Sequence, residues 1–129
     1  MFDTPYVMKL AQNLARHSGA RQAQIAKNIA NADTPGYRAR DVTAFSKTFE
    51  QSEQARDIRA TRPGHMTSTP LGTTYRTFDL GGEASPNGNN VSVEVEMARG
   101  TEAKSSHELA LTVYKSSLDM LRTSLGKGR

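Results

Sequence analysis

Two segments of the chain, one near each end, carry apolar and small residues at steps of three and four. Near the N-terminus this row consists of Val7, Ala11, Leu14, Ser18, Gln22, Ile25, Ile29 and Ala32. The spacing is that of one face of an α-helix. Thr4 suits the N-cap, because Pro5 then occupies the first helical position, where its missing N–H does no harm. Gly19 is an interior weakness of this predicted helix.

The second periodic segment begins near Ser92 and has larger apolar residues. Its row consists of Leu111, Tyr114, Leu118, Leu121 and Leu125, and Met97 and Lys104 extend it upstream. Alternating steps of three and four are typical of a coiled-coil seam. Ser92 suits the N-cap, with Glu94 and Glu96 near the positive end of the helix dipole. Gly126 then ends the predicted helix.

The segment between the two predicted helices, residues 33–91, is rich in turn-forming residues. Every proline after Pro5 lies in it. Residues 42–59 include a pattern that predicts a short helix, and residues 73–80, rich in Thr and aromatic residues, predict a strand or one arm of a hairpin. The chain therefore divides into an N-terminal helix (1–32), a loop-rich connection (33–91) and a C-terminal helix (92–129).

Composition limits how such a chain can fold. Leu, Ile, Val and Phe make up about 17% of the 129 residues, below the roughly 20% under which charged chains tend to lack a core. At 1.5 Å per residue the two helices would be roughly 40 and 50 Å long. We therefore predict a mainly α-helical fold in which the helices pair along their length and leave other faces for other copies.

The first helix must end abruptly. Thr34 precedes a proline, which disfavours the α conformation, so the helix ends at or before Asp33. Pro35 and Gly36 suit the central positions of a type II turn, with φ > 0 at Gly36. The turn delivers Tyr37 to a defined place, and two interpretations remain open: an ordinary helix stop, or a corner that contacts a neighbouring subunit with Tyr37 as its anchor.

The charge pattern raises a different possibility. The first helix carries Lys9, Arg16, Arg21 and Lys27 and no acidic residue, within a chain of net charge +4. Such a helix could bind nucleic acid or an anionic membrane surface, or it could itself be an organellar transit peptide. Opposite these charges lies mostly Ala rather than large apolar residues, which favours a solvated or partner-facing helix. No stretch has the 18 apolar residues of a membrane span, and no signal-peptide pattern begins the chain.

The residues of catalysis and metal binding do not form a recognisable constellation. Cysteine is absent, which excludes disulfides and thiolate chemistry. His17, His65 and His107 are far apart, and the zinc-protease helix pattern that His107 begins would need a second histidine where Leu111 stands. No phosphate-binding loop or nucleophile elbow occurs. We therefore predict no catalytic, cofactor-binding or metal-binding residue, and no enzymatic activity.

The run from Asn28 to Asp41, NIANADTPGYRARD, resembles a signature of the bacterial flagellar rod and hook protein family. The shared positions are Ala30, Asn31, Thr34, Gly36 and Tyr37, and the fuller run adds Asp33, Arg38, Ala39, Arg40 and Asp41. This longer form is most similar to rod proteins of the proximal, B-type branch. Residues 88–98 are similar to the start of the family's C-terminal helix, although Ser92 replaces its usual Asp and Gly100 is unexpected there.

The resemblance implies a structural subunit of the proximal rod of the flagellar basal body, whose terminal helices form an antiparallel coiled coil. It implies export without a cleaved signal, and partners comprising copies of the chain, other rod proteins, a basal-body adaptor and the export gate, with no nucleic acid and no membrane insertion. The implied subunit-contact residues are Ala30, Asn31, Asp33, Thr34, Pro35, Gly36, Tyr37, Arg38 and Arg40. The helix seam would comprise Leu14, Ile25, Ile29, Leu111, Tyr114, Leu118, Leu121 and Leu125.

The alternative is a small basic helical module that binds nucleic acid or an anionic membrane. The two hypotheses predict different responses to salt. Counterion release makes nucleic-acid binding fall steeply with salt, whereas apolar helix packing persists. A salt titration of binding to duplex DNA and anionic vesicles therefore distinguishes them.

Overall fold

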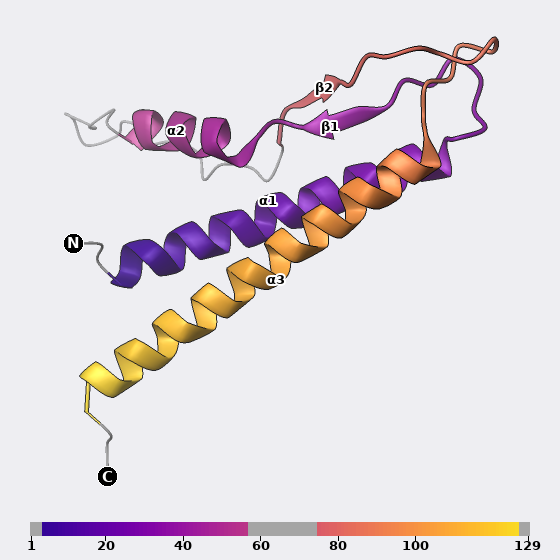
Figure 1. Cartoon of the computed structure of the whole chain (residues 1–129). Coiled ribbons are helices and arrows are strands. Elements are labelled where there is room, and N and C mark those ends of the chain that lie inside the picture. Colours follow the sequence, from indigo (N-terminus) through magenta and orange to yellow (C-terminus); the bar gives the residue numbers. More distant parts are fainter. Residues whose placement is uncertain (1–3, 57–74, 127–129) are drawn as a thin grey trace.

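The computed structural model describes residues 4–56 and 75–126 and shows two long helices joined by a small middle layer (Figure 1). Helix α1 spans Thr4–Ala30 and helix α3 spans Val93–Ser124. Between them come strand β1 (Arg40–Val42), helix α2 (Phe45–Arg56) and strand β2 (Thr77–Asp79). The predicted mainly helical fold, with long terminal helices packed against each other and a short helix and hairpin between them, is confirmed.

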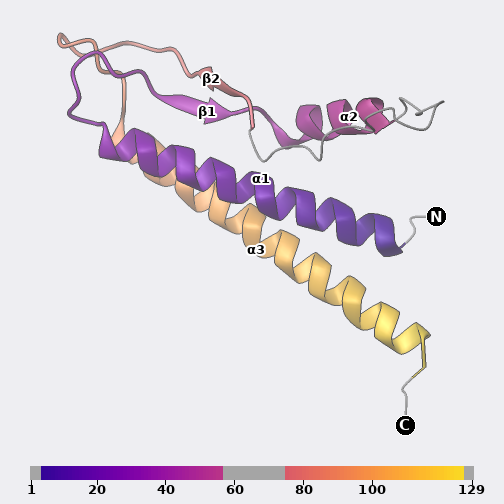
Figure 2. The same ribbon diagram turned by 180° about the vertical axis from the view of Figure 1, so that it is seen from behind.

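Helix α1 lies between α3 on one side and the layer of α2 and the hairpin on the other (Figures 1 and 2). The chain runs in opposite directions along α1 and α3, so both termini lie at the same end of the molecule. The two helices are close where the chain leaves α1 and enters α3, and they separate toward the termini. The tightest packing is therefore at the end far from the termini.

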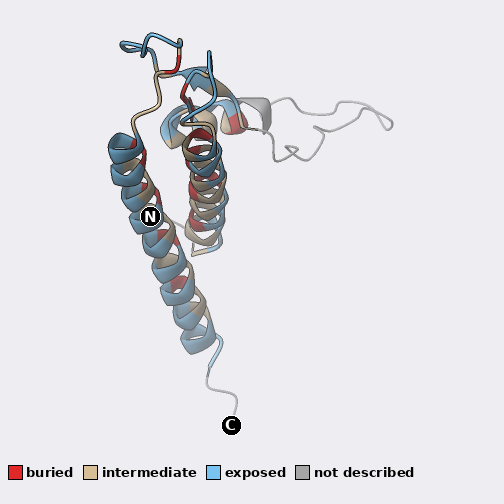
Figure 3. Ribbon diagram, turned by 90° about the vertical axis from the view of Figure 1, so that its right-hand side faces the viewer, coloured by how far each residue is buried: buried red, intermediate tan, exposed pale blue. Residues whose placement is uncertain are grey.

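The seam between α1 and α3 has buried positions at seven-residue spacing, and all but two of them are alanine or serine. In α1 its buried positions are Ala11, Ser18 and Ile25, and in α3 they are Glu96, Ala103, Ala110 and Ser117. In Figure 3 the buried residues form a row along the facing sides of the two helices. Alanine and serine let two helix backbones approach closely, but they bury little apolar surface.

The leucine row of α3 lies beside this seam rather than along it. Leu111 is 52% exposed and Leu125 is 85% exposed, whereas Tyr114, Leu118 and Leu121 are half-buried. The buried row lies one residue earlier along the helix, at positions 96, 103, 110 and 117. The close approach that small residues permit places them at the contact line, and it turns Leu111 toward solvent.

The ends of α3 follow their local sequence. The Ser92 side chain caps the helix by accepting from the backbone N–H of Val95 at 3.5 Å, and Glu94 and Glu96 lie in the first turn. The helix ends at Ser124, and Gly126 has φ +81°. The predicted N-cap and C-terminal glycine of this helix are therefore confirmed. Helix α1 begins at Thr4 itself.

The middle layer rests on α1 through the hairpin and an aromatic cluster. Strands β1 and β2 pair antiparallel, with Asp41 opposite Phe78. Strand β2 lies within the predicted segment 73–80, whose first two positions are outside the described residues; β1 was not predicted. Helix α2 lies within the predicted segment 42–59, of which residues 57–59 are outside the described part.

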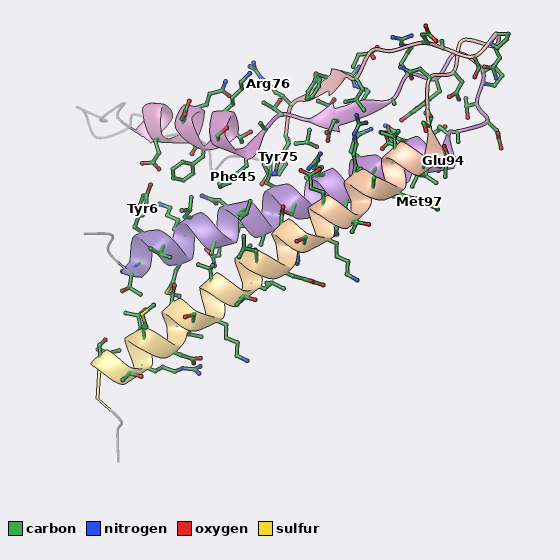
Figure 4. The ribbon with its side chains drawn as sticks, viewed as in Figure 1. Tyr6, Phe45, Tyr75, Arg76, Glu94 and Met97 are labelled. Carbon is green, nitrogen blue, oxygen red and sulfur yellow. The ribbon has the colours of Figure 1, made fainter. Side chains whose placement is uncertain are left out.

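The aromatic cluster surrounds His17, which is buried in α1. Its Nε2 donates to the backbone oxygen of Thr43 at 2.6 Å, and the rings of Phe45 and Tyr75 meet it edge-on. Phe45 and Tyr75 lie between α1 and the middle layer in Figure 4. Burial raises the pKa of the Tyr75 hydroxyl, an effect that the charge of Arg16 opposes. His17 therefore serves packing and hydrogen bonding.

Candidate functional site

The most densely connected part of the described chain is the corner, residues 31–37, together with the segments that surround it. Here the chain leaves α1 and turns into β1. Gly36 has φ +73°, and the N–H of Tyr37 donates to the oxygen of Thr34 at 3.2 Å across the turn. Together these features confirm the predicted turn, in which only glycine adopts the second central position without strain.

The side chain of Asn28 holds the corner against α1 and α3. It is fully buried, at 0% exposure. Its Nδ2 donates to the backbone oxygen of Arg40 at 2.7 Å and to Oε2 of Glu96 at 3.0 Å. Its Oδ1 accepts from Nε2 of Gln24 at 3.0 Å, the hydroxyl of Tyr37 at 3.0 Å and the N–H of Arg40 at 3.3 Å. We call these five residues the Asn28 cluster.

Glu96 brings α3 into this cluster. Its side chain is 2% exposed, and its other oxygen, Oε1, accepts from Nη1 of Arg99 at 3.0 Å. Arg99 is on the same helix, three residues on, and is partly exposed. A buried carboxylate is costly unless it is paired. Glu96 is satisfied on both oxygens, so the described cluster carries no unpartnered buried charge.

Two asparagines before α3 bind the loop to the corner. Asn89 is buried, and its Nδ2 donates to the backbone oxygens of Asn31 and Thr34, both at 2.8 Å. Asn90 accepts from the N–H of Ala39 at 2.6 Å and donates to the oxygen of Gly81 at 2.8 Å. Asn89 thus gives a second donor to two carbonyl oxygens that already accept from the N–H groups of Thr34 and Tyr37. Asn90 connects the chain after the corner to the loop before α3.

An ion pair joins α1 to β1 above the seam. Arg21 donates through Nε and Nη2 to the two carboxylate oxygens of Asp41, each at 3.2 Å. Its Nη1 lies 3.5 Å from Oε1 of Glu102 in α3. Burial lowers the pKa of Arg21, but the hydrogen bonds and charges of Asp41 and Glu102 outweigh this effect and raise the pKa above its ordinary value. Arg21 therefore stays charged and connects three elements.

Beside this ion pair lies a cleft of about 660 Å³ between α1, the hairpin and α3. Its walls include Leu14, Phe78 and Ala103 as well as Arg21 and Asp41.

Within residues 4–56 and 75–126, no group of three or more His, Asp or Glu side chains could hold a metal ion. None of the helices that the structure describes is long and apolar enough to cross a membrane.

The structure places the predicted corner residues in two groups. Tyr37 is half-buried, and its hydroxyl donates to Oδ1 of Asn28 in its own chain at 3.0 Å. Arg38 pairs with Asp79 at 3.1 Å, and Arg40 donates to Thr77 Oγ1 at 3.1 Å, so both contact β2. Asn31 is half-buried; the remaining predicted residues, Ala30, Asp33, Thr34, Pro35 and Gly36, are exposed.

Several residues of the site were not predicted, above all Asn28, Glu96, Arg21 and Asn89. The signal for Asn28 was available: it lies three residues after Ile25, on the face that points toward α3. A polar residue on a buried helix face needs a partner. The partner itself, 68 positions further along the chain, has no local signature.

The predicted helix-seam residues of α1 are at or near the contact with α3. Ile25 is buried, and Leu14 and Ile29 are half-buried. A Cβ added to Gly100 of α3 would lie 3.8 Å from Cγ2 of Ile25. Gly100 therefore lies against Ile25, and α3 stays helical through it.

Exposed apolar side chains lie on two sides of α3, away from its buried row, and at its C-cap. They are Val93, Val95, Met97, Leu109, Leu111, Met120 and Leu125. In Figure 4 the Met97 side chain points away from α1. Large apolar side chains gathered along an exposed helix mark a contact surface. Two long paired helices, a corner fixed by hydrogen bonds and exposed apolar side chains along α3 are typical of an elongated structural protein.

Comparison with known proteins agrees with this class. A family model described as "Flagella basal body rod protein" matches residues 18–38, which include Arg21, Asn28 and the corner. The chain is 30% identical over 116 residues to the flagellar basal body rod protein FlgB of Agrobacterium fabrum, with 85% of each chain covered. FlgB proteins of Escherichia coli and Bacillus subtilis are each 26% identical, over 94% and 92% of both chains.

The chain therefore belongs to the flagellar basal body rod protein family. It is a structural component of the basal body rod, and this family is not an enzyme family. Membership also implies association with other components of the rod. The alternative of a nucleic-acid or membrane-binding module has no support from these relatives.

Proposed function

We propose that this protein is a subunit of the proximal rod of the flagellar basal body and assembles through its terminal helices into the drive shaft. In this proposal residues 1–32 and 92–129 are the rod-core helices, and residues 33–91 connect them. The chain is exported without a cleaved signal into the periplasm-spanning rod. Its partners there are copies of itself, other rod proteins, the basal-body adaptor and the export gate.

The observation that carries this proposal is the exposed apolar surface of α3. Leu111 and Leu125 are more than half exposed in the single chain, although leucine is among the residues most often buried. The α1–α3 seam is made mostly of small residues, and within residues 4–56 and 75–126 it leaves these side chains largely uncovered. Packing against neighbouring subunits would remove them from water, at about 25 cal/mol per Å² of apolar area.

The exposed tip of the corner supports a second contact. Thr34, Pro35 and Gly36 are exposed, while the backbone beneath them is held by Asn89 and by the N–H of Gly36, which donates to the oxygen of Asn87 at 2.9 Å. A rigid exposed turn loses little conformational entropy on binding. We propose this tip as a contact to a neighbouring rod subunit.

The test is Leu111→Asp, with Thr112→Asp as the matched control. Both positions are exposed in the single chain, so neither variant should alter its helical circular dichroism spectrum. In a strain that lacks the native gene, Leu111→Asp should abolish motility and leave basal bodies with a ring but no rod, because a charge would replace a packed leucine. Thr112→Asp should restore swimming.

The outcomes separate clearly in electron micrographs of isolated basal bodies. A complete rod in the deletion strain would overturn the structural role itself. A complete rod with Leu111→Asp, together with loss of the rod in the deletion strain, would preserve the role but reject this surface as the contact.

A further inference from the structure

The seam between α1 and α3 has little in its shape that selects one alignment of the helices. Its α3 positions at seven-residue spacing are Glu96, Ala103, Ala110 and Ser117, and the next position in the series is Ser124. A slip of α3 by one heptad would put Ala103 where Glu96 stands and would leave an alanine or serine at every later place. At these positions small side chains of nearly equal volume fit both alignments, whereas beside them the slip would bring His107 to the place of Gly100 against Ile25.

Glu96 is the one residue of this series that is neither alanine nor serine, and it contacts Asn28, a buried polar residue of α1. Asn28 is fully buried, and its Nδ2 lies 3.0 Å from Oε2 of Glu96. After a heptad slip, Asn28 would face Ala103, so one of its donors would lose its acceptor inside the protein. A buried donor without a partner carries the full cost of its lost hydration. The hydrogen bond therefore distinguishes the two alignments at a position where the alanine and serine residues of the seam do not.

We propose that Asn28 and Glu96 are the register-determining pair of the two long helices. A single buried asparagine can select the alignment of paired helices in this way, at a cost in stability. The pair also determines which residues of α3 stand beside α1 and which remain exposed. This inference concerns the isolated chain and holds or fails independently of the proposed rod function.

The loop before α3 is a competing explanation. Asn89 donates to the backbone oxygens of Asn31 and Thr34, and a heptad slip of about 10 Å would require those bonds to break or the first turns of α3 to unwind. If this loop were sufficient, removing the carboxylate of Glu96 would leave the register unchanged. The experiment must therefore read the register directly.

Introduced cysteines can read it, because the native chain has none. Gly100 and Ile25 are in contact in the observed register, since a Cβ at Gly100 would lie 3.8 Å from Cγ2 of Ile25. Ile25→Cys with Gly100→Cys therefore reports this register, within the short distance that a disulfide needs. Ile25→Cys with His107→Cys reports the alignment after a slip of seven residues.

Each cysteine pair is placed in three backgrounds: native, Glu96→Ala and Glu96→Gln. Glu96→Ala makes the α3 series uniformly small, and Glu96→Gln keeps an oxygen that can accept from Asn28. With mild oxidation, the native chain and Glu96→Gln should form only the 25–100 disulfide. Glu96→Ala should lower the yield of that disulfide at least twofold and form the 25–107 disulfide.

A further variant moves the carboxylate by one heptad. Glu96→Ala combined with Ala103→Glu should make the 25–107 disulfide the major product. An unchanged 25–100 yield in Glu96→Ala, with native helical content, would overturn the proposal and favour the loop. Loss of helical content in Glu96→Ala would also overturn it, because Glu96 would then be needed for pairing itself and not for the choice of register.

Discussion

The two ends of the helix pair are held in different ways. At the corner end, Asn28, Glu96 and Asn89 are buried and fully hydrogen-bonded, and the helices lie close together. At the end near the termini, the helices separate, and Leu125 is 85% exposed (Figures 1 and 2). Directional bonds therefore define one end, whereas exposed apolar side chains occur along the whole of α3, from Val93 to Met120 and on to Leu125.

This difference assigns separate tasks to polar and apolar residues. Hydrogen bonds select one geometry because an unpaired buried group is costly, whereas apolar packing is non-directional. A subunit that joins neighbours needs a defined shape before it assembles and a free apolar surface with which to assemble. The corner end meets the first need, and the exposed side chains of α3 meet the second.

The largest predicted change is the loss of the Asn28 side chain. Asn28→Ala should lower the free energy of unfolding by about 3 kcal/mol, because the Glu96 carboxylate, the Tyr37 hydroxyl and the backbone of Arg40 each lose a buried partner. Urea titration followed by circular dichroism at 222 nm measures this change. The loss should be seen in the corner end as faster amide hydrogen exchange around β1.

Asn31→Ala is the matched control for that variant. Asn31 makes exposed hydrogen bonds to Lys27 and Thr34 through its side chain, so its replacement should cost less than about 1 kcal/mol. Equal losses in the two variants would contradict the view that burial at Asn28 dominates the stability of the corner end.

Gly36 and Gly19 should respond to replacement by alanine in opposite directions. Gly36 has φ +73° and nothing within 4 Å of an added Cβ, so Gly36→Ala is unfavourable through the backbone alone, by about 1 kcal/mol. Gly19 lies within α1 and is equally uncrowded, so Gly19→Ala should stabilise by about 0.5–1 kcal/mol. Thermal unfolding measures both, and two changes of the same sign would contradict the assigned conformation at Gly36.

The smallest predicted effect is the pH dependence of the hairpin, which comes from the Asp79 carboxylate. The pKa of Asp79 lies below 3.8, because the N–H of Gly81 donates to its Oδ1 at 2.7 Å and Arg38 binds its Oδ2 at 3.1 Å. A lowered folded-state pKa means that this carboxylate stabilises the hairpin above pH 3.8. The contribution is lost as the pH falls through the folded value.

Nuclear magnetic resonance titration of the Asp79 carboxyl carbon measures this pKa. Arg38→Gln should raise it, but it should remain below 3.8, because the larger cause is Gly81. Arg40→Gln should raise it less, since Arg40 acts on Asp79 through charge alone. A pKa of Asp79 at or above 3.8 in the native protein would contradict a stabilising ion pair between Arg38 and Asp79.

Local features of the chain were predictable where a single residue type determines the backbone. Thr34, Pro35 and Gly36 define the turn, because proline restricts φ and glycine adopts φ > 0. Ser92 defines the start of α3 by supplying an oxygen to the first free N–H groups. Helix periodicity likewise identified both long helices. Each of these effects acts over a few residues, so the sequence contains all the information needed.

The pairing of distant segments was much less predictable. Strand β1 has three residues, and it becomes a strand because residues 77–79 supply its hydrogen bonds and Arg21 binds Asp41. The contact row of α3 was predicted one residue too late, on the leucines. Periodicity identifies an apolar face, but it does not say whether that face packs within the chain or against a neighbour.

The sequence by itself determined the two helices, where each ends, the turn between α1 and β1, and the family signature. Only the tertiary structure decided that Tyr37 bonds to Asn28 of its own chain, that Glu96 lies beneath them, and that small residues rather than leucines form the seam. The reason is physical. Propensity, capping and turn geometry depend on neighbours in sequence, whereas burial and hydrogen-bond partnership depend on which distant residues the fold brings together.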